Sequence, residues 1–148
     1  TEGAQILRQA RQLGMKQQFF GLGGFASDKF IQLGGGAAEG LINNSYWEPN
    51  PKIPKSITFK ENFEKFSKME AEMFSAATYD AVYILKEAFE KAAVLGTDEA
   101  SKDALRKAMH QVDYVGVQGR TTFDKEGQAT LYVYIVQVKG GKRQIIGP

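Results

Sequence analysis

Apolar side chains recur at helical spacing in four stretches of the chain, and polar residues fill the positions between them. Residues 4–13 carry an apolar side chain at every third position and end at Gly14, which suits a left-handed C-terminal cap. Phe59, Phe63 and Phe66 share one face of a second helix, so we expect them in the core. The predicted helices span residues 4–13, 57–69, 74–95 and about 98–110.

The helix predicted at residues 74–95 is apolar around most of its circumference. Its one polar stripe is formed by Asp80, Tyr83, Glu87 and Lys91. Because such a helix is usually enclosed by other elements, we expect its apolar sides to be covered. Thr97 or Asp98 offers an N-cap for the helix that follows.

Shorter apolar and aromatic runs predict strands, separated by glycine-containing turns. The predicted strands cover residues 18–22, 41–42, 119–123, 131–138 and 143–146. The first should be buried, and a glycine-rich loop, Gly21–Gly24, follows it. Ser27 can cap a short helix at residues 28–33. Asp124–Gly127 and Gly140–Gly141 predict turns, the second of which closes a C-terminal hairpin.

These elements follow one another in the order α-β-α-β-α-α-α-β-β-β, which predicts an α/β protein with pieces of a doubly wound sheet. Such a fold should begin with a strand, yet this chain begins with a helix. Two front strands are too few to bury the neighbouring helices. We therefore expect that the chain is the C-terminal part of a longer protein.

The composition excludes several kinds of chemistry. The chain has 148 residues, 43% of them apolar, and a net charge of +2, which is too small to indicate nucleic-acid binding. It contains no cysteine and one histidine, His110, so thiol catalysis and multi-histidine metal sites are not expected. No nucleophile has a recognisable base, and no catalytic residue, metal or cofactor is predicted. No apolar run reaches the roughly 18 residues of a membrane-spanning helix.

Two features can be interpreted as binding chemistry or as plain structure. The loop Gly21–Gly24 lies between a strand and a helix, where backbone amides can face a ligand, although a simple tight turn explains it as well. It is not a Walker loop or a full dinucleotide motif. Phe74 can line an apolar pocket or pack in the core.

Four further residues are interpreted as structural. Tyr79 and Asp80 lie early in the helix at residues 74–95. A negative charge such as that of Asp80 stabilises a helix when it lies near the N-terminus. Trp47 lies in a loop, and its side chain is expected to cover the core. His110 is expected to cap a helix end or to lie on the surface.

Five segments, taken in order and spacing, resemble one family. They are Ile6–Gly14, Phe19–Gly21, Ala37–Gly40, Tyr79–Tyr83 and Thr122–Gly127. Together they are similar to the C-terminal part of the leucine/isoleucine/valine-type solute-binding proteins of ABC importers. The resemblance implies part of a type I periplasmic-binding-protein fold, in which two α/β lobes close over a ligand.

The resemblance also implies an organisation and a binding site. Residues 1–44 would end the second lobe, residues 57–112 would be helices of the first, and the β tail at 113–148 would return to the second. Ligand contacts would come from Gly23, Gly24, Phe25 and Phe74. Relatives that bind branched-chain amino acids carry an acidic residue at the position of Gly23. Either the ammonium group of the ligand finds another partner here, or the ligand has none.

The function implied is that of a substrate-binding component of an ABC importer. The solute would be a branched-chain or other apolar amino acid, or a related small carboxylate or amide. The alternative of the same fold is a ligand-sensing receptor or regulatory domain, and an enzyme is a more distant rival. The expected partners are the solute and membrane permease subunits, without nucleic acid, in the periplasm or anchored by lipid outside the cytoplasm. We also expect this chain to self-associate, because uncovered edges and apolar faces favour association.

Overall fold

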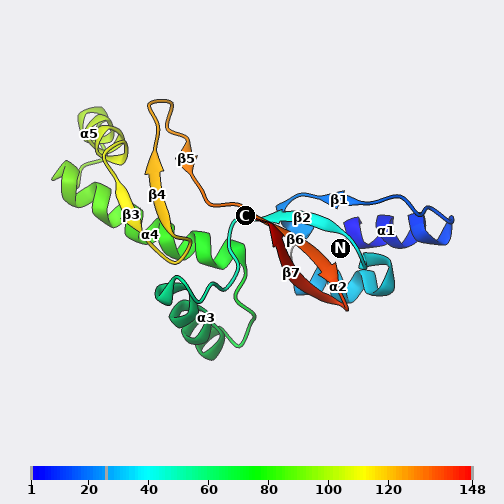
Figure 1. Cartoon of the computed structure of the whole chain (residues 1–148). Coiled ribbons are helices and arrows are strands. Elements are labelled where there is room, and N and C mark those ends of the chain that lie inside the picture. Colours follow the sequence, from blue (N-terminus) through cyan, green and yellow to red (C-terminus); the bar gives the residue numbers. More distant parts are fainter. Residues whose placement is uncertain (1, 26, 148) are drawn as a thin grey trace. The chain divides into compact units, whose positions relative to one another are not determined.

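The computed structural model describes residues 2–25 and 27–147 and divides into two compact units. Unit 1 comprises the residues up to Tyr46 together with those from Val133 on, and unit 2 comprises Trp47–Tyr132. Figure 1 shows the helices and strands of both units, which together form a mixed α/β structure as the sequence predicted.

Unit 1 contains a four-stranded sheet in the order β1-β2-β6-β7. The strands are β1 (Phe20–Gly21), β2 (Ile42–Ser45), β6 (Tyr134–Lys139) and β7 (Lys142–Gly147). β1 and β2 are parallel, whereas β6 runs antiparallel to both of its neighbours. The predicted C-terminal hairpin is therefore confirmed as β6–β7, and its turn has positive φ at both Gly140 and Gly141.

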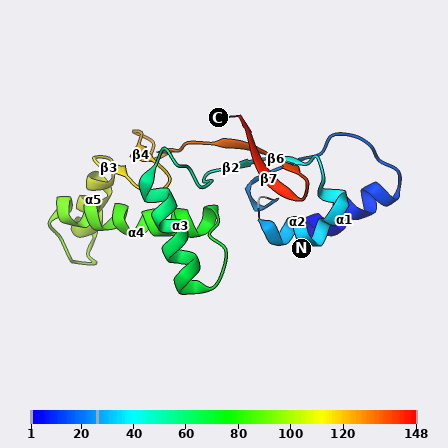
Figure 2. The ribbon, with the colours of Figure 1, turned by 60° about the horizontal axis from the view of Figure 1, so that its bottom comes forward.

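The helices of unit 1 bury one side of this sheet, which Figure 2 shows from a second direction. They are α1 (Glu2–Gln12) and α2 (Asp28–Gly34), with two short 3-10 helices, η1 (Gly23–Phe25) and η2 (Gly35–Ala38). Ser27 caps α2 as predicted, since its Oγ accepts a hydrogen bond of 3.2 Å from the backbone N–H of Phe30. The buried cluster that joins these elements contains Ala4, Leu7, Phe30, Ile31, Ala38, Leu41 and Val138.

The strand predicted to be buried at residues 18–22 is shorter and more exposed than expected. Only Phe20 and Gly21 form β1, and the side chain of Phe20 is 74% exposed, whereas Phe19 packs against the cluster. The reason is that β1 lies at the edge of the sheet and neighbouring residues of a strand point to opposite faces.

Unit 2 consists of three helices and a small antiparallel sheet. The helices are α3 (Pro54–Ser67), α4 (Met73–Ala92) and α5 (Glu99–Met109), and the sheet has the order β3 (Asp113–Val115), β4 (Arg120–Phe123), β5 (Ala129–Thr130). Asp98 is the N-cap of α5, with its carboxylate accepting from the backbone N–H of Ser101 at 3.0 Å. The sequence did not predict β3 or β5, which are only three and two residues long.

The strands that follow α5 divide between the two units. Residues 113–132 belong to unit 2, because Val112, Tyr114 and Phe123 pack with Ile84 of α4 and Ala108 of α5. Only the residues from Val133 on belong to unit 1.

Two expectations for the core of unit 2 are corrected. Phe59 is buried and Phe63 is partly buried, but Phe66 is 92% exposed because no described element covers the last turn of α3. α4 buries one side, including Ile84 and Ala88, whereas exposed apolar residues line the rest. Those residues include Phe74, Val82, Leu85 and Phe89. The expected enclosure of α4 is therefore absent among residues 2–25 and 27–147.

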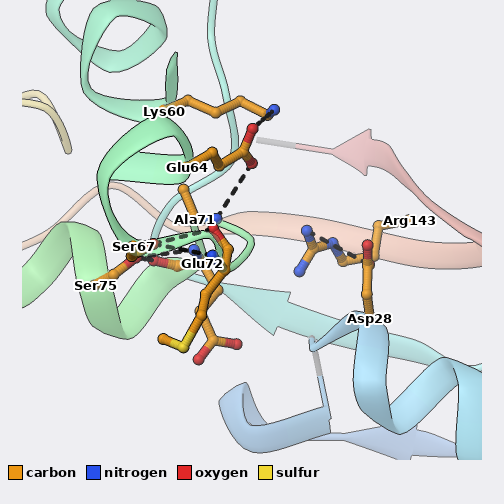
Figure 3. A network of polar contacts seen from close by, with 9 residues as sticks. Asp28, Lys60, Glu64, Ser67, Ala71, Glu72, Ser75 and Arg143 are labelled. Atoms are coloured by element: carbon orange, nitrogen blue, oxygen red, sulfur yellow. Dashed lines mark hydrogen bonds and ion pairs between the residues drawn. The ribbon is translucent and has the colours of Figure 1, made fainter. Parts of the chain in front are cut away.

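Trp47 plugs the core of unit 2, as predicted. It is 2% exposed, its Nε1 donates to Ser56 Oγ at 2.9 Å, and its ring meets that of Phe59 edge to face at 5.6 Å. The α3–α4 connection is held by polar contacts that Figure 3 shows. The carboxylate of Glu64 accepts from Lys60 at 2.7 Å and from the backbone N–H of Ala71 at 3.2 Å, and the Lys60 bond lowers the pKa of Glu64.

Candidate functional site

The glycine-rich loop of unit 1 leaves the carboxyl end of β1 and leads into α2. Since β1 and β2 are parallel, their carboxyl ends lie at the same edge of the sheet, which is where ligands bind in open α/β sheets. η1 forms this loop, and the backbone N–H of Gly23 donates to Asn44 Oδ1 of β2 at 2.9 Å. A Cβ placed on Gly24 would meet no atom within 4 Å, so the space beside that residue is open.

Phe25 lies in the same loop, but its ring faces the protein. The ring packs edge to face on Phe30, with 5.0 Å between centroids, and lies against the core cluster. A Cβ on Gly21 would approach the Phe25 side chain to 2.8 Å, and one on Gly3 to 2.5 Å. Both glycines therefore make room for this ring, whose first role in the structure is to anchor the loop.

Phe74 is the second residue of α4 in unit 2, and 56% of it is exposed. It lines a hollow of about 410 Å³ together with Phe59, Phe63, Ser75, Thr78, Tyr79 and Val82. The walls are mostly aromatic, and the hydroxyl groups of Ser75 and Thr78 supply polar atoms. Apolar walls with a few polar groups are typical of small-molecule sites. The structure thus brings Gly23, Gly24 and Phe25 together in unit 1 and places Phe74 in unit 2.

A larger groove of about 710 Å³ lies next to that hollow and shares Phe59, Phe63 and Tyr79 with it. Tyrosine rings follow one another along its wall. The centroids of Tyr79 and Tyr83 are 5.0 Å apart, and those of Tyr83 and Tyr114 are 6.2 Å apart in a stacked arrangement. The sequence did not identify this row, because Tyr114 comes from β3, far from α4 along the chain.

The electrostatics of the row follow from its packing. Burial, with smaller effects from Asp80 and the neighbouring tyrosines, raises the pKa of Tyr114 to about 12. The hydrogen bond to Tyr83, followed by burial, also raises the pKa of Tyr79. Both phenols therefore stay protonated at neutral pH, and they offer hydroxyl groups rather than charges to the groove.

Asp80 holds the loop that contributes Val117 to the groove. It is 1% exposed and accepts hydrogen bonds of 2.9 Å from the backbone N–H groups of both Val117 and Gln118. A Cβ on Gly116 would lie 2.2 Å from Asp80 Oδ1, so the loop passes close to the carboxylate. Asp80 is structural, as predicted, but it is the eighth residue of α4 and does not act on the helix N-terminus.

Other chemistry finds little support in the described part of the chain. Residues 2–25 and 27–147 hold no cluster of three or more histidine, cysteine, aspartate or glutamate side chains suited to a metal ion. His110 is exposed, follows the last residue of α5 and pairs through Nδ1 with the carbonyl oxygen of Asp124 at 2.8 Å. No helix of the described residues is both long and apolar enough to cross a bilayer.

Comparison with known proteins gives a consistent family. A family model described as periplasmic binding protein matches residues 1–143. The crystal structure of the leucine-binding protein LivK of Thermotoga maritima is 28% identical, with a TM-score of 0.81, and the match covers 97% of this chain and 40% of that one. A putative branched-chain amino acid ABC transporter protein of Rhodospirillum rubrum is 30% identical, with a TM-score of 0.72 and coverage of 97% and 41%.

More distant structures share the fold. A solute-binding protein of an ABC transporter from R. palustris, in complex with benzoate, is 19% identical, with a TM-score of 0.78 and coverage of 97% and 39%. This chain therefore spans about 40% of the length of the solved structures it matches. No curated protein sequence gives a significant match.

Proposed function

The chain belongs to the periplasmic binding protein family, and from this premise we propose that it is part of the substrate-binding component of an ABC importer. The observation that carries the proposal is the family match, which extends over residues 1–143. The protein would capture a small solute outside the cytoplasm and deliver it to permease subunits in the membrane, without chemical change to the solute.

The proposed solute is small and partly apolar. Phe74 offers an exposed aromatic face in a hollow with few polar atoms, which suits a branched-chain or other apolar side chain. One similar protein is a leucine-binding protein, and another holds benzoate. A branched-chain or other apolar amino acid, or a related small carboxylate or amide, agrees with both.

The proposed mechanism is closure of two lobes over the solute. Unit 1 would belong to one lobe and unit 2 to the other, with the Gly23–Gly24 loop contributing from the first and Phe74 from the second. Contacts made by both lobes with one ligand favour the closed state, because the ligand then has a higher affinity for that state. The exposed apolar side of α4 would be covered by the part of the fold that the solved relatives have and this chain lacks.

Native mass spectrometry of the intact protein, purified from its source without refolding, tests the proposal first. We expect a chain well above 16.4 kDa that carries a small molecule. Calorimetric titration with leucine, isoleucine, valine and benzoate should then identify a ligand that is recovered unchanged. A natural chain of this length with nothing bound, or turnover of the bound molecule, would contradict the proposal.

A matched pair of variants tests the role of Phe74. Phe74→Ala should weaken binding at least tenfold, because the ring supplies apolar area to the ligand. Phe89→Ala is the control, since Phe89 is an exposed phenylalanine of the same helix and does not line the hollow. Equal losses from the two variants would show that Phe74 makes no specific contact.

A further inference from the structure

The side chain of Asn44 joins β2 to the loop that follows the parallel strand β1. It lies in β2, one residue beyond Asn43, which pairs with Gly21 of β1. Its Oδ1 accepts the backbone N–H of Gly23 at 2.9 Å, across 21 positions of the sequence. This bond, together with the packing of the Phe25 ring, therefore holds the glycine-rich loop against the sheet.

That bond also determines which way the amide group of Asn44 is oriented. Because a backbone N–H needs an acceptor, the oxygen must face Gly23, and the NH₂ group with its two donors is on the other side. Among the residues that the structure describes, Nδ2 of Asn44 donates no hydrogen bond. The NH₂ group of Asn44 is thus an oriented hydrogen-bond donor that is available to a ligand, at the edge of the sheet where α/β proteins bind ligands.

The two chain segments that form this edge carry no negative charge of their own, and the first carboxylate after the loop, Asp28 of α2, pairs with Arg143 at 3.7 Å. Residues 21–25, which form the loop, and residues 43–46, around the end of β2, contain no acidic or basic side chain. Carboxylate and carbonyl oxygens accept hydrogen bonds from an amide NH₂ group, whereas an ammonium group is itself a donor and cannot pair with Nδ2 of Asn44.

We propose that Asn44 positions the glycine-rich loop and donates from Nδ2 to the ligand, so that the ligand presents an acceptor to unit 1 and carries no ammonium group. The ligand class is then a small carboxylate or amide with an apolar body, rather than a free amino acid. This inference rests on the proposed function and narrows its ligand.

Three compounds with one carbon skeleton test the inference on the intact protein by calorimetric titration. They are leucine, 4-methylpentanoate, which is leucine without its amino group, and 4-methylpentanamide. We expect the intact protein to bind the carboxylate or the amide at least tenfold more tightly than leucine. Asn44→Asp keeps an acceptor for Gly23 but replaces the donor with a negative charge, so it should reverse this preference.

Two control variants separate this role from general effects. Gln128→Glu makes the same change from amide to carboxylate at an exposed position before β5, outside the grooves of unit 2, and should leave the preference unchanged. Glu2→Gln removes the carboxylate next to Gly3, which contacts Phe25 of the loop, and it should also have no effect. Hydrogen exchange of the Gly23 amide should be slow in the unsubstituted protein and in Asn44→Asp, and faster in Asn44→Ala.

Each contrary result has its own meaning. Tighter binding of leucine that depends on Glu2 would overturn the inference, while the solute-binding function would stand. The same preference in Asn44→Asp as in Gln128→Glu would show that Asn44 does not contact the ligand. Failure of all three compounds, together with an intact protein that retains no solute, would overturn the proposed function and this inference with it.

Discussion

Asp80 of α4 accepts a hydrogen bond of 2.9 Å from the backbone N–H of Val117, which is 37 positions away along the chain. Its other carboxylate oxygen accepts from Gln118 at the same distance, and Asp80 is 1% exposed. One side chain therefore fixes the loop between β3 and β4 against α4. The tyrosine row of unit 2 depends on this loop, because Tyr114 lies just before it.

Removing this carboxylate should destabilise unit 2. Asp80→Ala leaves two backbone N–H groups without an acceptor in a buried position, and we expect a loss of about 2–4 kcal/mol in the free energy of unfolding. Urea unfolding followed by the fluorescence of Trp47, which is buried in unit 2, and by circular dichroism measures it. Asp103→Ala, at an exposed position of α5, is the control and should change stability by less than about 0.5 kcal/mol. Similar values for both variants would contradict the role given to Asp80.

The same residue predicts how stability changes with pH. Burial raises the pKa of Asp80 above its ordinary value of 3.8, although the bonds from Val117 and Gln118 and the charge of Lys55 oppose the change. The folded chain then holds this proton more tightly than the unfolded chain does. The contribution of Asp80 to stability is therefore largest below about pH 4 and decreases as the pH rises through its raised pKa.

Unfolding free energies of the wild type and Asp80→Asn, measured at intervals from about pH 4 to about pH 7, test this sign. The stability of the wild type relative to the variant should fall as the pH rises. A relative stability that rises across this range would mean that the hydrogen bonds outweigh burial and that the pKa is lowered.

Introducing an acidic residue at position 23 should change which ligands bind. Gly23→Glu places a carboxylate where the family resemblance implies one in binders of branched-chain amino acids, and Gly23 has no positive φ that a side chain would strain. We expect the affinity for leucine, relative to 4-methylpentanoate, to rise at least tenfold, or about 1.4 kcal/mol. Calorimetric titration measures the ratio, with Gly23→Gln as the control for added bulk without charge. An unchanged ratio would show that position 23 does not face the charged end of the ligand.

The exposed apolar side of α4 should make the 148-residue chain self-associate. Val82 is 62% exposed and Leu85 is 45% exposed, so lysine at both positions should shift the chain toward monomer. Sedimentation velocity at several concentrations measures the change. Gln128→Lys, at an exposed position before β5, is the control for added charge. A wild-type chain that sediments as a monomer throughout would contradict the prediction.

Structure that depends on near neighbours could be predicted from the sequence. The helices, the Ser27 and Asp98 caps and the β6–β7 turn all arise from residues within a few positions of one another. The burial of Trp47 was also predicted, because it lies in the loop at residues 46–54, which holds three of the four prolines and was expected to cover the core. The family resemblance rests on such local segments, and the family match agrees with it.

The tertiary structure decided what depends on distant partners. Three hydrogen bonds join residues that are 21 to 38 positions apart: Gly23 to Asn44, Val117 to Asp80 and Gln118 to Asp80. No local sequence pattern predicts them. Phe59 and Phe66 were predicted to lie on the same face of α3, yet Phe59 is buried and Phe66 is exposed. Periodicity determines which face of a helix a residue occupies, but burial requires another element to cover that face, and only the folded chain determines where such elements lie.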